Sequence, residues 1–364
     1  MIKYDKKYID KSLIPGKEYL VEELLRSTLE GFPLIVLVAI AAFTLYTLSK
    51  GADILVDEAV ALSVKWGIPK MIIGATIVSL GTTLPEAAVS VGAALQGNPD
   101  LALGNAVGSV ICDTALIIGL ASFIAPLKLD KSLTNKQGWL QFGAGLLLIA
   151  VSIPWLSMDT GFSQDGNISQ FIGFGFVLLL IIYMITSMKS VKKSDGLGEI
   201  VNDIAEDEKS SSSLIVMIKL ILGIALIIVS SKILIPTVEL GAVRVGIPQS
   251  VIAATLVAFG TSLPELVTAI TAARKGHGEL AIGNIIGADI LNVLFVVGVS
   301  ASVTGTGLVV PSSFFTFQFP VMMIALLVFR ATTLFAKKAI TRKHGAVLFG
   351  IYVIYLVSSF TWLS

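Results

Sequence analysis

Long apolar stretches alternate with short polar breaks along most of this chain. A transmembrane helix needs about 20 predominantly apolar residues, and ten stretches of the sequence meet that requirement. They lie at roughly 32–64, 69–96, 100–125, 137–157, 168–188, 213–243, 248–273, 278–303, 313–336 and 345–363. The first and sixth are long enough to be tilted or to extend past the bilayer. The pattern predicts an all-α, polytopic membrane protein with ten transmembrane helices.

An acidic, serine-rich stretch at 189–212 divides the spans into two groups of five. Its polar, charged composition predicts a flexible cytoplasmic linker. Segment 17–30 carries leucines on roughly one side, which is compatible with an interfacial amphipathic helix or with a poorly ordered tail. The predicted organisation is an N-terminal tail at 1–30, a five-helix repeat at 31–188, the linker at 189–212 and a second five-helix repeat at 213–364.

The two halves of the chain are related by an internal repeat. A shift of 179 residues places 74–119 over 253–298, and 18 of those 46 positions are identical. The motif GTTLPE at 81–86 recurs as GTSLPE at 260–265, whereas chance similarity between apolar segments would match mainly leucine, valine and alanine. Because each half has an odd number of spans, the halves should have opposite orientations, with a binding site at their interface.

The distribution of Lys and Arg predicts the orientation in the membrane. If the N-terminus is outside, the inside loops hold Lys65, Lys70, Lys128, Lys131, Lys136, Lys189, Lys192, Lys193, Lys209, Arg274, Lys275, Lys337, Lys338, Arg342 and Lys343. The outside loops then hold only Arg244, although the lysine-rich N-terminal tail argues for the opposite orientation. Because the loops agree with one another, we predict a multi-pass protein of the plasma or inner membrane with both termini outside.

Composition excludes several classes of function. The chain is 55% hydrophobic and 14% charged, more apolar than a soluble domain of this length needs to be. Its formal net charge of +1 does not indicate a nucleic-acid partner, and the single Cys112 excludes an internal disulfide. The sequence has no HExxH, GxSxG or Walker motif. We therefore expect neither an enzyme nor a cofactor.

A proline interrupts the helix in each copy of the repeated motif. Pro85 and Pro264 each remove a backbone donor and displace the carbonyl four residues earlier. Freed backbone oxygens in a membrane require protein, water or an ion to satisfy them. Glu86 and Glu265 follow directly, and ionisable residues at membrane depth indicate a functional site. Broken helices repeated in both halves are typical of a transporter's midplane site.

Further oxygen-bearing side chains share faces with these glutamates. The residues that precede the glutamates are Ser79, Thr82 and Thr83 in the first half, and Ala258, Thr261 and Ser262 in the second. The next span of each half carries residues spaced by four, namely Asn105, Ser109 and Asp113, then Asn284, Ala288 and Asn292. Small residues that would allow close helix contact lie beside them, at Gly104, Gly108, Gly283 and Gly287. Hydroxyls, carbonyls and carboxylates are the ligands of hard cations such as Ca²⁺ and Na⁺.

Crossing of these four helices at the midplane would bring Glu86, Glu265, Asp113 and Asn292 together. Three carboxylates without an ion would repel one another, so at least one should be protonated or hydrated when the site is empty. Ca²⁺ would offset two charges, and several Na⁺ ions at overlapping positions would do the same, which makes the ions compete. The alternative is that the polar residues only join helices. It applies to an isolated hydroxyl such as Ser79, and much less to two symmetric Pro–Glu pairs.

At these residues the chain resembles the sodium/calcium exchanger branch of the calcium:cation antiporter superfamily. That family's two alpha-repeats carry G-T-[ST]-x-P-E followed by G-N-x-x-G-[SA]-x-x-x-[DN], and here they read GTTLPE with GNAVGSVICD and GTSLPE with GNIIGADILN. The resemblance implies Na⁺/Ca²⁺ antiport by alternating access. It also implies that Glu86 and Glu265 bind Ca²⁺ with the carbonyls of Thr82 and Thr261. The implied Na⁺ positions are lined by Ser79, Thr83, Ser109, Ala258, Ser262 and Ala288.

Two departures from the family pattern affect the predicted site. Prokaryotic relatives tend to have Asn at the end of the first repeat motif and Asp at the end of the second, whereas this chain has Asp113 and Asn292. Inverted symmetry makes the exchange tolerable because the total charge is unchanged. Ala288-Asp289 replaces the commoner Ser-Asn. Asp289 therefore faces a neighbouring cavity or adds a ligand for K⁺ or H⁺, and these alternatives remain open here.

Secondary active Na⁺/Ca²⁺ exchange is the leading prediction, with Ca²⁺, Na⁺ and membrane lipid as partners and a monomer sufficient for transport. H⁺/Ca²⁺ exchange is the first alternative, because a proton needs only a carboxylate, and a K⁺-dependent exchanger is another. The threonine and serine pairs beside the glutamates favour Na⁺. A cation channel could use a carboxylate ring, but such rings usually come from subunit symmetry.

Overall fold

The computed structural model describes residues 17–155, 164–189, 212–246 and 260–362. The helices of the first half are α1 (Lys17–Glu30), α2 (Leu34–Trp66), α3 (Lys70–Ile73), η2 (Gly74–Val78), α4 (Ser79–Thr82), α5 (Leu84–Leu95), α6 (Pro99–Ile111), η3 (Cys112–Ile117), α7 (Ile118–Ile124), α8 (Lys131–Ser152) and α9 (Gln170–Lys189). Those of the second half are α11 (Ser213–Arg244), α14 (Leu263–Arg274), α15 (Gly278–Leu291), η7 (Asn292–Val297), α16 (Gly298–Val303), η8 (Phe314–Gln318), α17 (Phe319–Phe335) and α18 (Arg342–Trp362).

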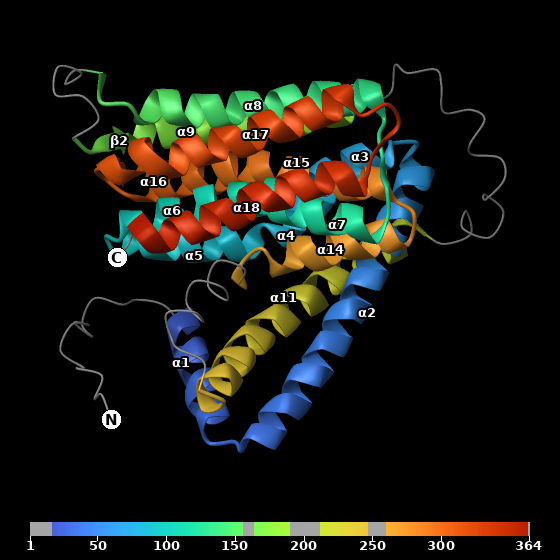
Figure 1. Ribbon diagram of the computed structural model, residues 1–364, viewed down its shortest axis with the longest axis vertical. Helices are drawn as coiled ribbons and strands as arrows, with labels where there is room; N and C mark the ends of the chain where they lie inside the picture. Colours follow the sequence, from blue (N-terminus) through green and yellow to red (C-terminus); the bar gives the residue numbers. More distant parts are fainter. Residues whose placement is uncertain (1–16, 156–163, 190–211, 247–259, 363–364) are drawn as a thin grey trace.

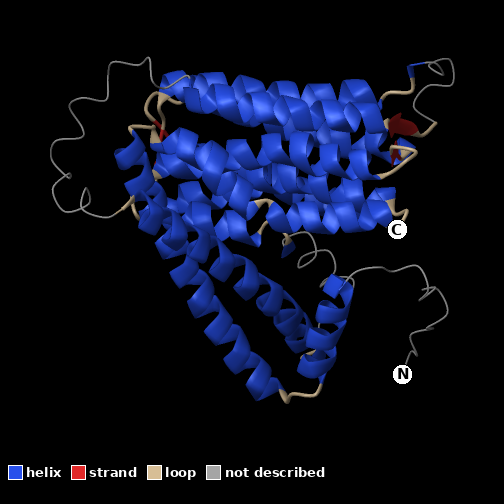
Figure 2. Cartoon of the chain, turned by 180° about the vertical axis from the view of Figure 1, so that it is seen from behind, coloured by secondary structure: helices blue, strands red, loops and turns tan. Residues whose placement is uncertain are grey.

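Two long helices diverge from a bundle formed by the others. Figures 1 and 2 show α2 and α11 side by side, leaving the bundle at an angle, with α1 near their far ends. A Cβ added to Gly51 would lie 3.0 Å from Ile227 Cγ1, and one on Gly223 would lie 2.9 Å from the backbone nitrogen of Leu55. Glycine therefore permits close contact between α2 and α11. These are the first and sixth predicted spans, whose length suggested tilt.

Six helical segments are long and apolar enough to cross a membrane, judged by length and composition within the described residues. They are Leu34–Trp66, Pro99–Ile124, Gln170–Lys189, Ser213–Arg244, Gly278–Val303 and Phe314–Phe335. The pair Lys70–Thr82 and Leu84–Leu95, bent by 47°, forms a seventh if it is one broken span. The helices α8 and α18 have 22 and 21 residues, and the predicted span at 248–273 lies partly outside the described residues. Ten spans therefore remain a prediction.

Two predicted segments lie outside the predicted spans, at 17–30 and at 189–212. The helix considered for 17–30 is present as α1 with those bounds, and its position at a membrane interface stays a prediction. Arg26 of α1 forms an ion pair with Glu239 of α11 at 2.8 Å. The linker predicted at 189–212 lies almost entirely outside the described residues.

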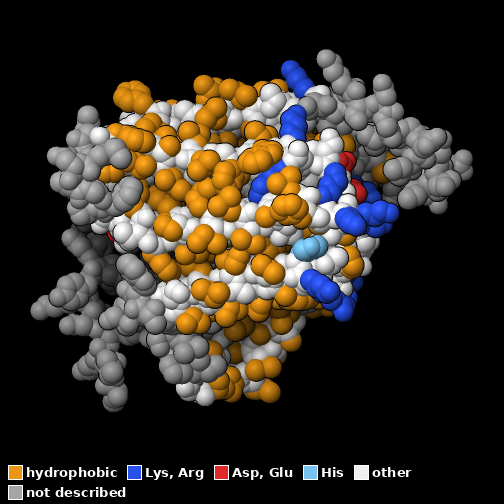
Figure 3. Space-filling view, turned by 45° about the horizontal axis from the view of Figure 1, so that its top comes forward, with side chains coloured by type: hydrophobic (Ala, Val, Ile, Leu, Met, Phe, Trp, Pro, Cys, Tyr) orange, Lys and Arg blue, Asp and Glu red, His pale blue; other side chains and the backbone are white. Residues whose placement is uncertain are grey.

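Four very short strands form two antiparallel ladders that the all-α prediction did not include. β1 (Leu127–Lys128) pairs with β4 (Ala339–Ile340), and β2 (Gly166–Ile168) pairs with β3 (Leu308–Val310). Each ladder joins two loops that the predicted topology places on the same side of the membrane. Figure 3 shows Lys and Arg side chains gathered toward one end of the bundle, beside a broad apolar surface.

The centre of the bundle is built around contact between the first broken helix and α15. A Cβ on Gly283 would lie 2.1 Å from the carbonyl oxygen of Met71, and one on Gly287 would lie 2.6 Å from Ala75 Cα. The expected close approach is therefore present at both glycines. At Gly104 the nearest described atom is 3.8 Å away, and at Gly108 none lies within 4 Å. The segment related to the first broken helix by the repeat falls mostly at 247–259, outside the described residues.

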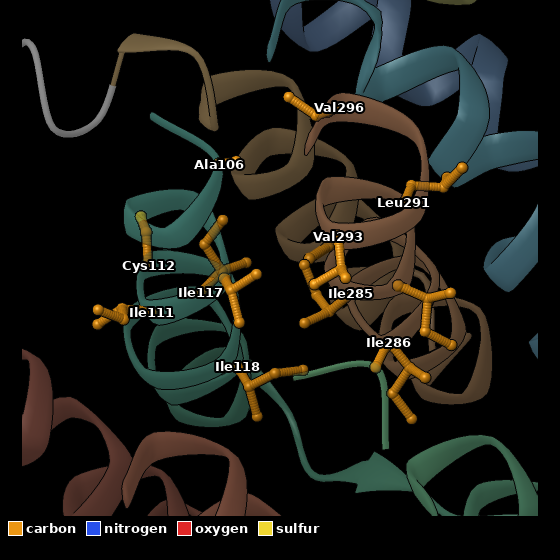
Figure 4. Close-up of a cluster of buried hydrophobic side chains, with 14 of the residues drawn as sticks. Ala106, Ile111, Cys112, Ile117, Ile118, Ile285, Ile286, Leu291, Val293 and Val296 are labelled. Carbon is orange, nitrogen blue, oxygen red and sulfur yellow. The ribbon is translucent and has the colours of Figure 1, made fainter. Parts of the chain in front are cut away.

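Buried apolar side chains flank the polar stripes on the two related helices α6–η3 and α15–η7. Figure 4 shows these helices near each other, with Ile117 of η3, the adjoining Ile118 of α7, and Ile285 and Val293 of α15–η7 among the buried side chains. Ile117, Ile118 and Ile285 are 0% exposed. The packing around the polar residues is thus apolar and close, which fixes their positions.

The substitution Gly283→Ala should lower the free energy of unfolding by about 1–3 kcal/mol, the usual cost of overpacking. The added methyl would have to push the backbone of Met71 away. Gly143→Ala on α8 is the matched control, because its Cβ would meet nothing within 4 Å and alanine favours a helix. Thermal unfolding of the detergent-solubilised protein measures both, and equal melting temperatures for the two variants would contradict the packing argument.

Candidate cation site

A new helix begins at the same relative position in both repeated motifs. Thr83 separates α4 from α5 with φ −82° and ψ 0°, and Ser262 precedes α14 with φ −82° and ψ 8°. A proline follows within the first turn of each new helix, as expected for a residue that needs no helical donor. Glu86 and Glu265 lie in the first turns of α5 and α14. The first turn of a helix stabilises negative charge through its free N–H groups.

Three carboxyl groups gather inside the bundle. Glu86, Glu265 and Asp113 are all 0% exposed. Glu86 lies within electrostatic range of the other two, and Asp113 lies within range of Glu265. Burial of several carboxyl groups is costly unless a proton or a positive charge compensates them. Within the described ranges, none of the ion pairs includes these residues.

Most oxygens of this carboxylate centre lack a protein donor. Both oxygens of Glu86, both of Asp113 and Oε2 of Glu265 have no hydrogen-bond partner among the described residues. Buried polar atoms are normally satisfied, so five unpartnered oxygens in one region indicate a missing partner. A hard cation accepts this type of ligand. The described residues contain no group of three or more His, Cys, Asp or Glu side chains close enough to hold a metal by themselves. Hydroxyl and carbonyl oxygens would therefore have to complete the coordination.

The two halves of the chain exchange hydrogen bonds across the centre. Thr82 donates to Asn284 Oδ1 at 3.4 Å, and Thr261 donates to Asn105 Oδ1 at 3.0 Å. Because Thr82 corresponds to Thr261 and Asn105 to Asn284 under the 179-residue shift, each contact is the repeat-related copy of the other. Such reciprocal contacts are the pattern that two oppositely oriented repeats would produce.

Hydroxyls from each half also reach the acids of the other half. Thr83 Oγ1 lies 3.4 Å from Glu265 Oε1. Its counterpart Ser262 lies beside the carboxyl groups of Glu86 and Asp113, and its Oγ has no hydrogen-bond partner among the described residues. These two hydroxyls are therefore placed to add ligands to the carboxylate centre.

The side chain of Asn105 forms more hydrogen bonds within the site than its counterpart Asn284 does. The Nδ2 atom of Asn105 donates to the carbonyl of Glu86 at 3.1 Å and to Ser90 Oγ at 2.9 Å. Asn284 Nδ2 has no partner within the described part of the chain. The residue that corresponds to Ser90 is Ala269, whose side chain cannot accept a hydrogen bond.

Turns of π-helix, which were not predicted from the sequence, lie at the second polar stripe of each half. η3 begins at Cys112, directly before Asp113, and η7 begins at Asn292. π-turns often occur at functional sites, because the extra residue per turn redirects side chains. Asn292 is 1% exposed and its Oδ1 has no described partner. The repeat shows that the two segments correspond, but it does not distinguish a π-turn from an α-helix.

The remaining predicted ligands are Ser79, Ser109 and Ala258. Ser79 donates to the carbonyl of Thr76 at 3.3 Å, within its own helix, which is the structural role considered as its alternative. Ser109 lines a groove of about 190 Å³ together with Asn105 and Thr261. Asp100 and two tyrosines of α18 are also part of that lining. Ala258 lies outside the described residues.

A separate polar cluster surrounds the additional acid of the second repeat. Asp289 is 2% exposed and lies on α15. Its Oδ2 accepts hydrogen bonds from Thr114 and from Gln141 Nε2, the latter at 2.5 Å. Gln141 comes from α8, a helix on which no site residue was predicted from the sequence.

Apolar helices packed around buried carboxylates define a multi-pass membrane protein of the transporter class. The family described as "Sodium/calcium exchanger protein" matches residues 36–189 and 215–361. The chain therefore belongs to the sodium/calcium exchanger family.

Individual relatives agree with that assignment. The sodium/calcium exchanger MaX1 of Methanosarcina acetivorans is 30% identical over 86% of this chain and 95% of its own length. The inner membrane protein YrbG of Escherichia coli is 32% identical over 86% of this chain and 93% of its own length. Among solved structures, the sodium-calcium exchanger NCX_Mj soaked with 10 mM Na⁺ superposes with a TM-score of 0.73 at 27% identity. That match covers 90% of this chain and 99% of NCX_Mj.

Replacement of Asn105 by alanine should lower the free energy of unfolding by about 1–3 kcal/mol, because it leaves buried polar groups unpaired. The groups affected are the Thr261 hydroxyl and the Glu86 carbonyl. Asn284→Ala is the control at the repeat-related position, where a single contact at 3.4 Å is lost, so its effect should be smaller. Thermal unfolding in detergent compares the two. A larger loss for Asn284→Ala would show that the hydrogen bonds of Asn105 do not stabilise the site.

Proposed function

We propose that this protein exchanges Na⁺ for Ca²⁺ across the membrane by alternating access at the carboxylate centre. The observation that supports this most directly is the set of five carboxylate oxygens without partners, contributed by Glu86, Asp113 and Glu265. Both halves contribute to the set, as expected for a site between repeats. The solved relative NCX_Mj is a sodium-calcium exchanger that was soaked with Na⁺, Ca²⁺ and Sr²⁺.

Exchange follows from the competition of two ions for one set of oxygens. Ca²⁺ takes six to eight oxygen ligands, and the carboxylates of Glu86 and Glu265 with the carbonyls of Thr82 and Thr261 would supply several of them. Na⁺ ions would use the same carboxylates together with the hydroxyls of Thr83 and Ser262, or of Ser79 and Ser109. Ca²⁺ and Na⁺ cannot use the shared ligands at the same time, so one kind of ion leaves as the other binds. Side-chain hydroxyls beside both glutamates favour Na⁺ over H⁺ as the coupling ion.

The helix α11 is placed to control access to the centre. A Cβ on Gly81 would lie 2.3 Å from Ile224 Cδ1, and one on Gly260 would lie 3.4 Å from Ile235 Cδ1. α11 therefore packs against the repeated glycines that precede Thr83 and Ser262, while its most extensive contact is with α2. In our proposal, α2 and α11 move together against the bundle, a form of the rocking expected for transporters built from repeats.

The proposed orientation follows the gathering of Lys and Arg at one end of the bundle, which would face the cytoplasm. Both termini would then lie outside. The groove lined by Asn105, Ser109 and Thr261 includes Asp100 at the first turn of α6, which this orientation places near the outer surface. The groove would thus serve as an outward path for ions.

Labelled Ca²⁺ should enter proteoliposomes loaded with Na⁺ when they are diluted into Na⁺-free buffer. Glu86→Gln should reduce that uptake at least about tenfold, a loss of about 1.4 kcal/mol or more, because it removes a charged ligand. Asp165→Asn is the matched control, because Asp165 is exposed and caps the backbone of Ser312 with an oxygen that asparagine retains. Uptake that follows a pH gradient and ignores Na⁺ would replace the proposal with H⁺/Ca²⁺ exchange. A requirement for K⁺ in the external buffer would assign a K⁺-dependent exchanger.

Asp113 and Asn292 test whether the two repeats are interchangeable at the site. Asp113→Asn should reduce Na⁺-driven uptake about tenfold or more, because one carboxylate is lost. Adding Asn292→Asp returns the charge at the repeat-related position and should restore part of the activity. The same uptake assay compares the single and double variants, and no recovery in the double variant would refute this equivalence.

A further inference from the structure

The cluster around Asp289 has no counterpart in the other half of the chain. The 179-residue shift relates Asp289 to Val110 and Thr114 to Val293, so both polar residues correspond to buried apolar ones. The third member, Gln141, lies on α8, outside the repeated segment. The cluster is therefore an addition to the symmetric ligand set.

One oxygen of Asp289 is buried without a partner. Oδ2 accepts from Thr114 and Gln141, whereas Oδ1 has no hydrogen-bond partner among the described residues. If the carboxylate is ionised, Oδ1 is an acceptor without a donor. If Oδ1 carries the proton, it is a donor without an acceptor. Neither form is satisfied by the described protein groups, and no described ion pair includes Asp289.

We propose that Asp289, Thr114 and Gln141 bind an alkali-metal cation at a site distinct from the carboxylate centre. The cation would contact Oδ1 of Asp289 and the hydroxyl oxygen of Thr114. The Gln141 amide donates to Asp289 through Nε2 in this structure, and a half-turn of the amide would present Oε1 as a further ligand. A single carboxylate matches a monovalent charge, whereas Ca²⁺ normally takes several carboxylates and carbonyls.

The site is coupled to the carboxylate centre through charge. Asp113 lies within electrostatic range of Asp289, and Asp289 lies within range of Glu265. Thr114 also follows Asp113 directly in η3. A cation on Asp289 would reduce the negative potential at the centre and so weaken cation binding there. By linkage the effect is reciprocal. This regulatory consequence rests on the proposed exchange, whereas the cation site itself does not.

Polar side chains on α8 and α9 continue from the cluster toward the lysine-bearing end of the bundle. Gln137 lies one helical turn before Gln141, and its Nε2 is 3.3 Å from Ser187 Oγ near the end of α9. Gln137 Oε1 has no partner within the described residues. These buried groups extend the polar cluster from Asp289 toward that end of the bundle.

Equilibrium binding of labelled Na⁺ to the purified full-length protein tests the site. Asp289→Asn should lose one bound Na⁺ per molecule, because one carboxylate neutralises one monovalent charge. In a Glu86→Gln, Glu265→Gln background, this Na⁺ should persist and should disappear when Asp289→Asn is added. Asp165→Asn, an exposed residue that caps the backbone of Ser312, is the control. Competition by unlabelled K⁺ shows which alkali cation the site prefers.

Thr114→Val provides a second test if Asp289→Asn does not fold. Valine is present at the related position 293, where it packs well, and the variant keeps the acid while removing one ligand. It should weaken the additional Na⁺ site at least about tenfold. Unchanged Na⁺ stoichiometry and affinity in the folded variants would overturn the proposal and leave Asp289 bound to water alone. Failure of Na⁺-driven Ca²⁺ uptake in the wild type would refute the proposed exchange, but would leave the binding result as an independent answer.

Discussion

The structure depends on the cost of burying carboxyl groups in an apolar bundle. Glu86, Glu265 and Asp113 are fully enclosed, and the energy of an unpaired buried charge is large enough to offset much of a protein's stability. No described basic side chain pairs with them. Under the proposed function, the ion bound there would contribute to the energetics of the fold as well as being the cargo, and it should stabilise the native state by mass action.

Close backbone contact makes the site rigid on one side. Gly283 and Gly287 bring α15 against the helix that ends at Thr82, so the hydroxyl of Thr82 and the amide of Asn284 meet directly. The packing leaves no room for even a methyl group at Gly283. Because protein interiors are close-packed and deform little, the ligands are positioned by glycine as much as by the polar residues themselves.

Sequence reasoning could predict the parts of the fold that depend on local chemistry. Pro85 and Pro264 indicated the helix breaks; the structure has the first at Thr83 and begins α14 directly after Ser262. The π-turns at Asp113 and Asn292 have no sequence signature that separates them from an α-helix. The short strand ladders contain two or three residues each, too few for a periodic pattern. Gln141 could not be assigned either, because it joins Asp289 from 148 residues away.

α11 contacts both repeats of the chain through Ile224 and Ile235. Ile224 and Ile235 are separated by 11 residues, about three turns or 16 Å, and so share one face of the helix. They touch the breaks of two repeats that we infer to have opposite orientations. A rigid displacement of α11 would then expose one entrance as it covers the other. Both entrances could not open together, so an ion gradient would not be lost through slippage without counter-transport.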